Sequence, residues 1–209
     1  MAPKINKIIY ILTTADIMMV SALSLIMPLF AIFITENITG AGIKTVGFFT
    51  GIYWISKSFF QIPIAWFLDK KDGEKDEFYA MVAGYCLLAL VAFSYIKAEV
   101  VWHIYGLAVL TGLADALGVP SYLSIFSRHL DKFKENVEWT IRSIGVGLSA
   151  AAAGALAGII VDKFGFNAVF VLGGILSLLA AIILLFIKPY LKTTDGRSAA
   201  PPSIGSRKI

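Results

Sequence analysis

The sequence predicts an all-α membrane protein with six transmembrane helices. Hydrophobic residues make up 58% of the 209 positions and charged residues only 15%, whereas soluble domains are about 45–50% apolar and about 25% charged. Six apolar stretches are each long enough to cross a bilayer, which takes about 20 helical residues. We place them at residues 8–34, 46–68, 78–96, 100–126, 140–161 and 166–187.

The first stretch follows a short basic segment, residues 1–7, as the apolar part of a secretory signal would. It is much longer than such a signal, and no small-residue cleavage site follows it. We therefore interpret it as a retained helix. Residues 1–192 are expected to form one transmembrane domain, and residues 193–209, rich in Pro, Gly and Ser, a disordered cytoplasmic tail.

The basic residues indicate the orientation of the chain. Apart from Lys57, only Lys44, Lys97 and Lys163 lie in the connections of one side, so fourteen of the 18 basic residues lie on the other. Arg142 is counted in this majority, in the connection between the fourth and fifth stretches. The positive-inside rule then predicts that both termini are cytoplasmic, in the plasma membrane. The net charge of +4 is explained in this way, and no nucleic-acid partner is expected.

Lys57 is the only basic residue in the middle of a long apolar stretch. It lies roughly 15 Å from either end of residues 46–68, too far for its stem to reach water. An ammonium group at this depth costs several kcal/mol unless it is paired or hydrated. Thr50, Tyr53, Lys57 and Gln61 recur at helical spacing and share one face. We expect this stripe to line a solute or ion pathway, although helix–helix contact is the simpler alternative.

Two carboxylates inside the apolar stretches are candidate partners of Lys57. Asp16 lies about two turns into the first stretch, and Asp115 lies near the centre of the fourth. Either could neutralise Lys57 or titrate in a proton-coupled cycle. The alternatives are a hydrated Asp16 near the cytoplasmic rim and a static salt bridge from Asp115 to Lys57.

Small residues follow one face of the fifth stretch, at Gly147, Gly154 and Gly158. Such a stripe is typical of closely packed transmembrane helices, so we expect these glycines to serve helix packing. Cys86 is the only cysteine, and both histidines lie near the ends of apolar stretches. We therefore expect no metal site and no cofactor.

Three local patterns occur in order along the chain. Ala65-Trp-Phe-Leu-Asp69-Lys70-Lys71-Asp72-Gly73 follows the second stretch, Gly112-Leu-Ala-Asp-Ala-Leu-Gly-Val-Pro120 lies in the fourth, and Gly158-Ile-Ile-Val-Asp-Lys-Phe-Gly165 ends the fifth. Together they resemble major facilitator superfamily transporters, whose loop between helices two and three reads Gly-x-x-x-Asp-Arg/Lys-x-Gly-Arg/Lys. Ala65 replaces the first Gly of that motif, and Gly73 is displaced by one residue. Ala108 stands where the family usually has an arginine, which would leave Lys57 as the only basic residue at mid-membrane depth.

The resemblance implies a six-helix bundle like the N-terminal half of a family member, which transports a small solute by alternating access, with protons as a candidate coupling ion. It also implies a conformational latch in which Asp69 pairs with Arg128, with Lys70 and Gly73 in the same loop. Family members usually have twelve spans, so we expect a homodimer or a separate partner half to complete the cavity.

Two other functions stay open at this point. One is a non-transporting membrane assembly factor. The other is an intramembrane aspartyl protease using Asp16 and Asp115, since Gly112-Leu-Ala-Asp115 resembles a Gly-x-Gly-Asp motif. Ala114 replaces the second glycine of that motif, so we do not expect an enzyme.

Overall fold

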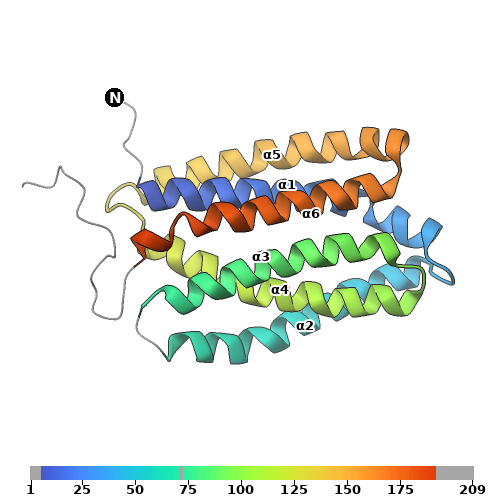
Figure 1. Cartoon of the computed structure of the whole chain (residues 1–209), viewed down its shortest axis with the longest axis horizontal. Coiled ribbons are helices and arrows are strands. Elements are labelled where there is room, and N and C mark those ends of the chain that lie inside the picture. Colours follow the sequence, from blue (N-terminus) through green and yellow to red (C-terminus); the bar gives the residue numbers. More distant parts are fainter. Residues whose placement is uncertain (1–5, 71–72, 192–209) are drawn as a thin grey trace, which may run out of the picture.

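The computed structural model of the chain describes residues 6–70 and 73–191. Within them the helices run side by side along the long axis of the molecule (Figure 1), which confirms the all-α class with six long helices. The elements are α1 (Lys7–Asn37), α2 (Ile43–Asp69), α3 (Lys75–Ser94), η1 (Tyr95–Lys97), α4 (Val101–Arg128), α5 (Glu135–Phe164), α6 (Phe166–Leu185) and η2 (Lys188–Tyr190). The predicted tail, residues 193–209, lies outside the described residues.

Five of these helices, all except α2, are long and apolar enough to cross a membrane. α2 has 27 residues, which is long enough to cross a membrane, so it differs from the other five helices in its composition and not in its length. The polar stripe that includes Tyr53 and Lys57 lowers its apolar content. That α2 also crosses the membrane stays a prediction, supported by its position alongside α4 in the bundle (Figure 1).

The helices form two groups, which meet mainly where α3 packs on α6 and more weakly where α1 contacts α2 and α4. In one group α5 and α6 pack on α1, and in the other α2 and α3 pack on α4, while α3 and α6 join the groups. Figure 1 shows α5 and α2 at opposite edges of the bundle. Each edge helix is covered on one face only, because α2 buries only Thr45 and Phe49, and α5 only Glu138, Ala153 and Ala157.

Two apolar clusters fill the interior, one toward each end of the bundle. The first includes Leu12, Phe78 and Phe126, and the second includes Phe33, Ile104 and Phe170. Rings in the second cluster make edge contacts, such as Phe33 with Phe170 at 4.7 Å between centroids. Aromatic pairs of this kind add about 0.5–1.5 kcal/mol to the burial of their area.

The closest helix approaches occur at glycines of α3 and α4. A Cβ on Gly84 would lie 2.6 Å from the carbonyl oxygen of Ala114, and one on Gly112 would lie 2.8 Å from the backbone nitrogen of Lys57. No side chain fits at either point without moving a backbone. These two glycines therefore hold α4 tightly between α3 and α2.

The helix-packing role predicted for the glycines of α5 stays a prediction, because the bundle itself makes no close contact at any of the three positions. A Cβ on Gly147 or Gly158 would meet nothing within 4 Å, and one on Gly154 would make only ordinary contacts, the nearest at 3.8 Å. The close contact of α5 is at Gly145, where a Cβ would lie 2.7 Å from Ile17 of α1. The small residues identify a face of α5 that another helix can approach closely. The sequence of α5 alone does not show which of its faces packs on α1.

The start of α5 also corrects the sequence-based boundaries. The helix begins at Glu135, five residues before the predicted residue 140. Arg142 lies inside α5, as the predicted stretch 140–161 implies, and not in the preceding connection where the count of basic residues placed it. The first turn is polar, so apolar content alone does not identify it as part of the helix. Its acidic side chains, Glu135 and Glu138, stabilise the positive end of the helix dipole. Arg142 lies about 10 Å beyond the first residue of α5.

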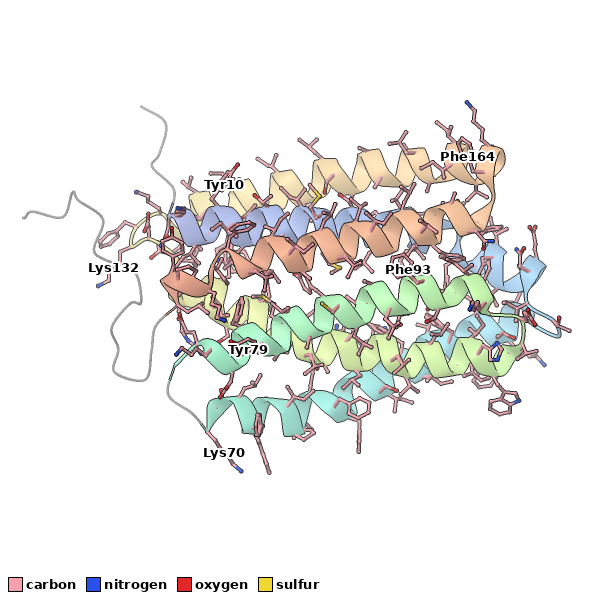
Figure 2. All side chains as sticks on the ribbon, viewed as in Figure 1. Tyr10, Lys70, Tyr79, Phe93, Lys132 and Phe164 are labelled. Atoms are coloured by element: carbon pink, nitrogen blue, oxygen red, sulfur yellow. The ribbon has the colours of Figure 1, made fainter. Side chains whose placement is uncertain are left out.

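One end of the bundle, which we call the basic end, is where α1 begins and α2 and α4 finish. Figure 2 shows Lys70 and Lys132 at this end and Phe164 at the other. Asn6 donates a hydrogen bond to the carbonyl oxygen of His129 at 3.0 Å, and Lys7 donates one to the Tyr190 hydroxyl at 2.6 Å. The start of α1 and the end of α6 therefore lie together. The cytoplasmic location of the basic end stays a prediction.

Candidate functional site

The polar cluster around Lys57 lies midway along α2 and α4. Lys57 Nζ is 3.1 Å from Asp115 Oδ2 and 3.2 Å from the Tyr53 hydroxyl. Tyr53 donates a short hydrogen bond to the same carboxylate oxygen. Lys57 is about 20 Å from the first residue of α2 and about 18 Å from the last, so the pair lies deep along the helices.

The crossing of α2 and α4 explains why these groups meet. At Gly112 the backbone of α2 comes close enough that a Cβ would also touch the carbonyl oxygen of Tyr53 at 2.8 Å. Asp115 follows Gly112 by about one turn, so its side chain reaches the face of α2 that carries Tyr53 and Lys57. Because Gly112 has no side chain, α4 lies close to α2, and this brings the carboxylate of Asp115 within reach of Lys57 and Tyr53.

Lys57 also contacts an aromatic ring of its own helix. Its Nζ lies 5.0 Å from the centroid of the Trp54 ring, a separation at which a cation is attracted to the ring face. Trp54 is 56% exposed, and the side chains of Lys57 and Asp115 are 13% and 17% exposed. The cluster is therefore open to the surface of the bundle and not sealed inside it.

The other members of the predicted stripe stay apart from this cluster. Thr50 is exposed, and its hydroxyl donates to the carbonyl oxygen of Val46 at 3.2 Å. Gln61 is half-buried one turn beyond Lys57. The four residues follow one face of α2, but only Tyr53 and Lys57 contact Asp115.

Asp16 has a different partner, which sequence reasoning missed. Its Oδ2 lies 2.7 Å from a guanidinium nitrogen of Arg142, joining α1 to α5. The side chains of Asp16 and Arg142 are 10% and 23% exposed. Arg142 is thus a second cation inside a transmembrane helix, and Lys57 is not the only fixed positive charge of the bundle interior.

Aromatic side chains enclose the guanidinium group of Arg142. Its centre lies 5.2 Å from the Tyr122 ring and 5.5 Å from the Trp139 ring, and its Nε donates to the Tyr122 hydroxyl at 3.1 Å. Arginine is suited to such a site because its planar group stacks on rings and forms directed hydrogen bonds. Trp139, three residues before Arg142, is the sequence signal that could have identified it.

The two ion pairs lie on different pairs of helices, α2 with α4 and α1 with α5. Each carboxylate is held by its own cation. A protease dyad requires two carboxylates that share a proton, so this arrangement does not support the aspartyl protease alternative.

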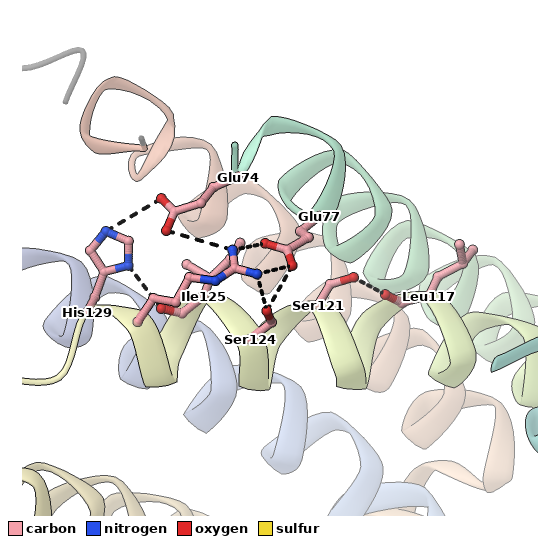
Figure 3. Close-up of polar contacts among 8 residues, drawn as sticks. Glu74, Glu77, Leu117, Ser121, Ser124, Ile125 and His129 are labelled. Atoms are coloured by element: carbon pink, nitrogen blue, oxygen red, sulfur yellow. Dashed lines mark hydrogen bonds and ion pairs between the residues drawn. The ribbon is translucent and has the colours of Figure 1, made fainter. Parts of the chain in front are cut away.

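A third group of charges ties α3 to α4 at the basic end (Figure 3). Arg128 donates to both oxygens of Glu77, at 2.5 and 2.7 Å, and to Ser124 at 2.7 Å. Glu74 lies 3.9 Å from Arg128 and 3.5 Å from His129. Such bidentate arginine–carboxylate pairs are both strong and directional.

This group differs from the predicted latch, because no ion pair joins Arg128 to Asp69 in the described part of the chain. The electrostatic attraction of Arg128 to Asp69 is weaker than its attraction to Glu77 and to Glu74. A groove lined by Phe67 and Tyr79 lies between the last turns of α2 and the first turns of α3. Lys70 follows the end of α2 and is exposed, and Gly73 has a φ of 116° in the turn into α3.

A comparison with protein families identifies the chain. The family model described as Major Facilitator Superfamily matches residues 9–207. The chain belongs to the major facilitator superfamily. Proteins of this superfamily are typically transporters and not enzymes, so the chain is a multi-pass membrane protein whose substrate is a small molecule. No solved structure matches the chain.

Proposed function

We propose that this chain forms one half of an alternating-access transporter, in which the cluster of Lys57, Asp115 and Tyr53 lines the solute pathway. The observation that carries the proposal is the partial exposure of two intramembrane ion pairs at the surface of the bundle. Charged side chains at this depth normally face a bundle interior or a water-filled cavity. Lipid chains would solvate these charged side chains poorly. We therefore propose that water and a second half of the transporter cover the exposed parts of the two ion pairs.

The edge helices support the proposal that a second half completes the cavity. α2 exposes Ile55 and Phe59, at 72% and 69%, on the side away from its contact with α4. α5 leaves Gly147 and Gly158 open, where a neighbouring backbone could approach closely. We propose a second copy of this chain as that half, because six spans with both ends on one side allow two copies to lie parallel around a two-fold axis.

The ion pair of Lys57 and Asp115 gives the pathway a switchable charge. A proton on Asp115 weakens its hold on the ammonium of Lys57, which then becomes available to an anionic group of the solute. Loss of that proton restores the pair and favours release of the solute. The same geometry therefore supports proton coupling, with Tyr53 as a hydrogen-bond donor to whichever acceptor replaces the carboxylate.

The charges of the basic end support a latch for one conformation of the transporter. Arg128 and Glu77 hold the start of α3 against the end of α4. We propose that Asp69 becomes the alternative partner of Arg128 when the bundle rocks, with the turn at Gly73 accommodating the movement of α2. Discrete rearrangements of ion pairs are a common element of such two-state transitions.

Uptake into proteoliposomes tests the pathway. A panel of labelled small solutes would be offered with and without a pH gradient, to the parent protein and to Lys57→Ala, Asp115→Asn and Asp16→Asn. The proposal expects uptake by the parent and a loss of at least tenfold with the first two variants. Lys44→Ala, on an exposed position of the same helix, is the matched control. If all three variants transport as the parent does, the polar cluster does not line the pathway. The assembly-factor alternative likewise predicts that removal of the charge at Lys57 leaves the function of the protein intact.

The proposed dimer has its own test. Native mass spectrometry and crosslinking in mild detergent would measure how many copies form the transport-competent particle. The proposal expects two copies in that particle, whereas one copy with a different partner protein would support a second half but not the homodimer. A strictly monomeric species that transports solute would contradict it.

A further inference from the structure

A groove runs along the membrane-facing surface where the start of α1 meets the end of α6 and η2. Its volume is about 480 Å³, and Ile11, Ile183, Leu185 and Phe186 line its apolar walls. The groove opens at the basic end, where Lys7 and Tyr190 form its polar rim. It lies apart from both intramembrane ion pairs, none of whose residues line it.

Among the described residues, the polar rim carries one positive charge, that of Lys7. Lys7 Nζ donates to the Tyr190 hydroxyl at 2.6 Å and lies 4.9 Å from the centroid of that ring. Lys7 is exposed, none of the described carboxylates pairs with it, and none of the described residues that line the groove is acidic. An ammonium group has three donors, so donors remain available to an anion next to the Tyr190 ring.

The molecule that fills the groove must therefore have an anionic group, which lies at the rim near the basic end, and an apolar chain, which lies along the walls farther from that end. We infer that this groove binds an anionic phospholipid, with its phosphate at Lys7 beside the Tyr190 ring and an acyl chain along the walls formed by α1 and α6. Basic pockets between transmembrane helices on the cytoplasmic side are suited to anionic headgroups. The charge pattern predicts that the basic end is cytoplasmic, where anionic lipids are concentrated.

The site differs from a general aromatic belt in two respects. Tyr10, at 65% exposure, and Phe186, also at 65%, flank a groove and not a convex surface. Thr14 adds no free donor to the wall, since its hydroxyl is bonded to the carbonyl oxygen of Tyr10 at 2.9 Å. The wall is therefore apolar below the rim, as an acyl chain requires.

Native mass spectrometry of the full chain in mild detergent tests the inference. Phosphatidylglycerol and phosphatidylcholine with identical acyl chains would be added in separate titrations, and inorganic phosphate would be added as a competitor. The parent should retain phosphatidylglycerol about fivefold more tightly than phosphatidylcholine, the effect of one lysine near an anionic surface. Inorganic phosphate should not displace it, because the acyl chain contributes most of the contact.

Variants separate the headgroup contact from the chain contact. Lys7→Gln should remove the preference for phosphatidylglycerol. Leu185→Trp, which fills the groove from an exposed position, should weaken the binding of both lipids. Lys163→Gln, exposed near the end of α5, should leave the preference intact. Equal retention of the two lipids by the parent, an unchanged preference in Lys7→Gln, displacement by phosphate, or unchanged lipid retention in Leu185→Trp would each overturn the inference.

Discussion

Lys57 and Asp115 form an ion pair of 3.1 Å across a helix crossing at which Gly112 has no room for a side chain. The position of the charge pair is thus set by backbone contact and not by the charges themselves. This relationship connects the packing of α2 on α4 with the proposed solute pathway. Changes in the crossing should therefore affect the pair, even when neither charged residue is altered.

Gly112→Ala should destabilise the protein by about 1–3 kcal/mol, the usual cost of overpacking. The new Cβ would lie 2.8 Å from the Lys57 nitrogen, the Tyr53 carbonyl oxygen and the Ser56 Cβ, so α2 must move away. The measurement is the thermal unfolding midpoint in detergent. Gly106→Ala on the same helix is the control, because a Cβ there meets nothing within 4 Å. Equal effects of the two variants would contradict the close crossing.

Lys57→Ala should cost more stability than Lys57→Ala combined with Asp115→Asn. The single variant leaves a carboxylate without its cation inside the bundle, which costs about 3–5 kcal/mol for a buried pair and less here, because both side chains are partly exposed. The double variant removes the unpaired charge. Unfolding midpoints of both variants and of Asp115→Asn give the coupling energy. A coupling energy near zero would mean that the two residues do not interact in the folded protein.

Arg142→Lys should destabilise the protein although it keeps the positive charge. Lysine lacks the planar group that lies against Tyr122 and Trp139, and the loss of those contacts costs about 1–2 kcal/mol. Tyr122→Phe should cost only about 1 kcal/mol, because it removes one hydrogen bond and keeps the ring. The measurement is again the unfolding midpoint. An Arg142→Lys variant as stable as the parent would show that only charge matters at this position.

Glu77→Gln should weaken the basic end more than Asp69→Asn does. Glu77 accepts two hydrogen bonds from Arg128 and one from Ser124, so loss of its charge costs about 1–2 kcal/mol. Asp69 makes no ion pair with Arg128 in this conformation. Hydrogen exchange in the first turns of α3 and the last turn of α4 would show which variant loosens the contact. A larger effect of Asp69→Asn would favour the latch predicted from the loop motif.

Hydrophobic length and charge distribution predicted the six helices well, because apolar runs of about 20 residues have few alternatives in a membrane. The helix ends were less predictable. Glu135 and its neighbours continue α5 through a polar turn, which apolar content does not recognise. Arg142 lies inside the predicted stretch 140–161, but it was counted with the basic residues of the connection, which hid its pairing with Asp16.

The candidate site was predictable in its residues but not in its pairing. Lys57, Asp16 and Asp115 stand out because charges inside apolar helices are costly. Which carboxylate meets Lys57 depends on where α2 and α4 touch, and that point is set by Gly112. Nothing in the spacing of Gly112 distinguishes it from Gly147, which meets no neighbour. Contact between helices is a property of the whole bundle, so the sequence of one helix does not reveal it.

Accessibility of the polar face of α2 tests the central claim, a water-filled solute pathway at Lys57, without knowledge of the solute. In a Cys86→Ser background, which removes the exposed native thiol, Gln61→Cys and Thr50→Cys lie on the face of Lys57, and Ile55→Cys lies on the opposite face. Each variant would be treated in native membranes with a membrane-impermeant thiol reagent. The account predicts labelling of Gln61→Cys and Thr50→Cys, and none of Ile55→Cys. Labelling of Ile55→Cys alone, or of no variant, would contradict it.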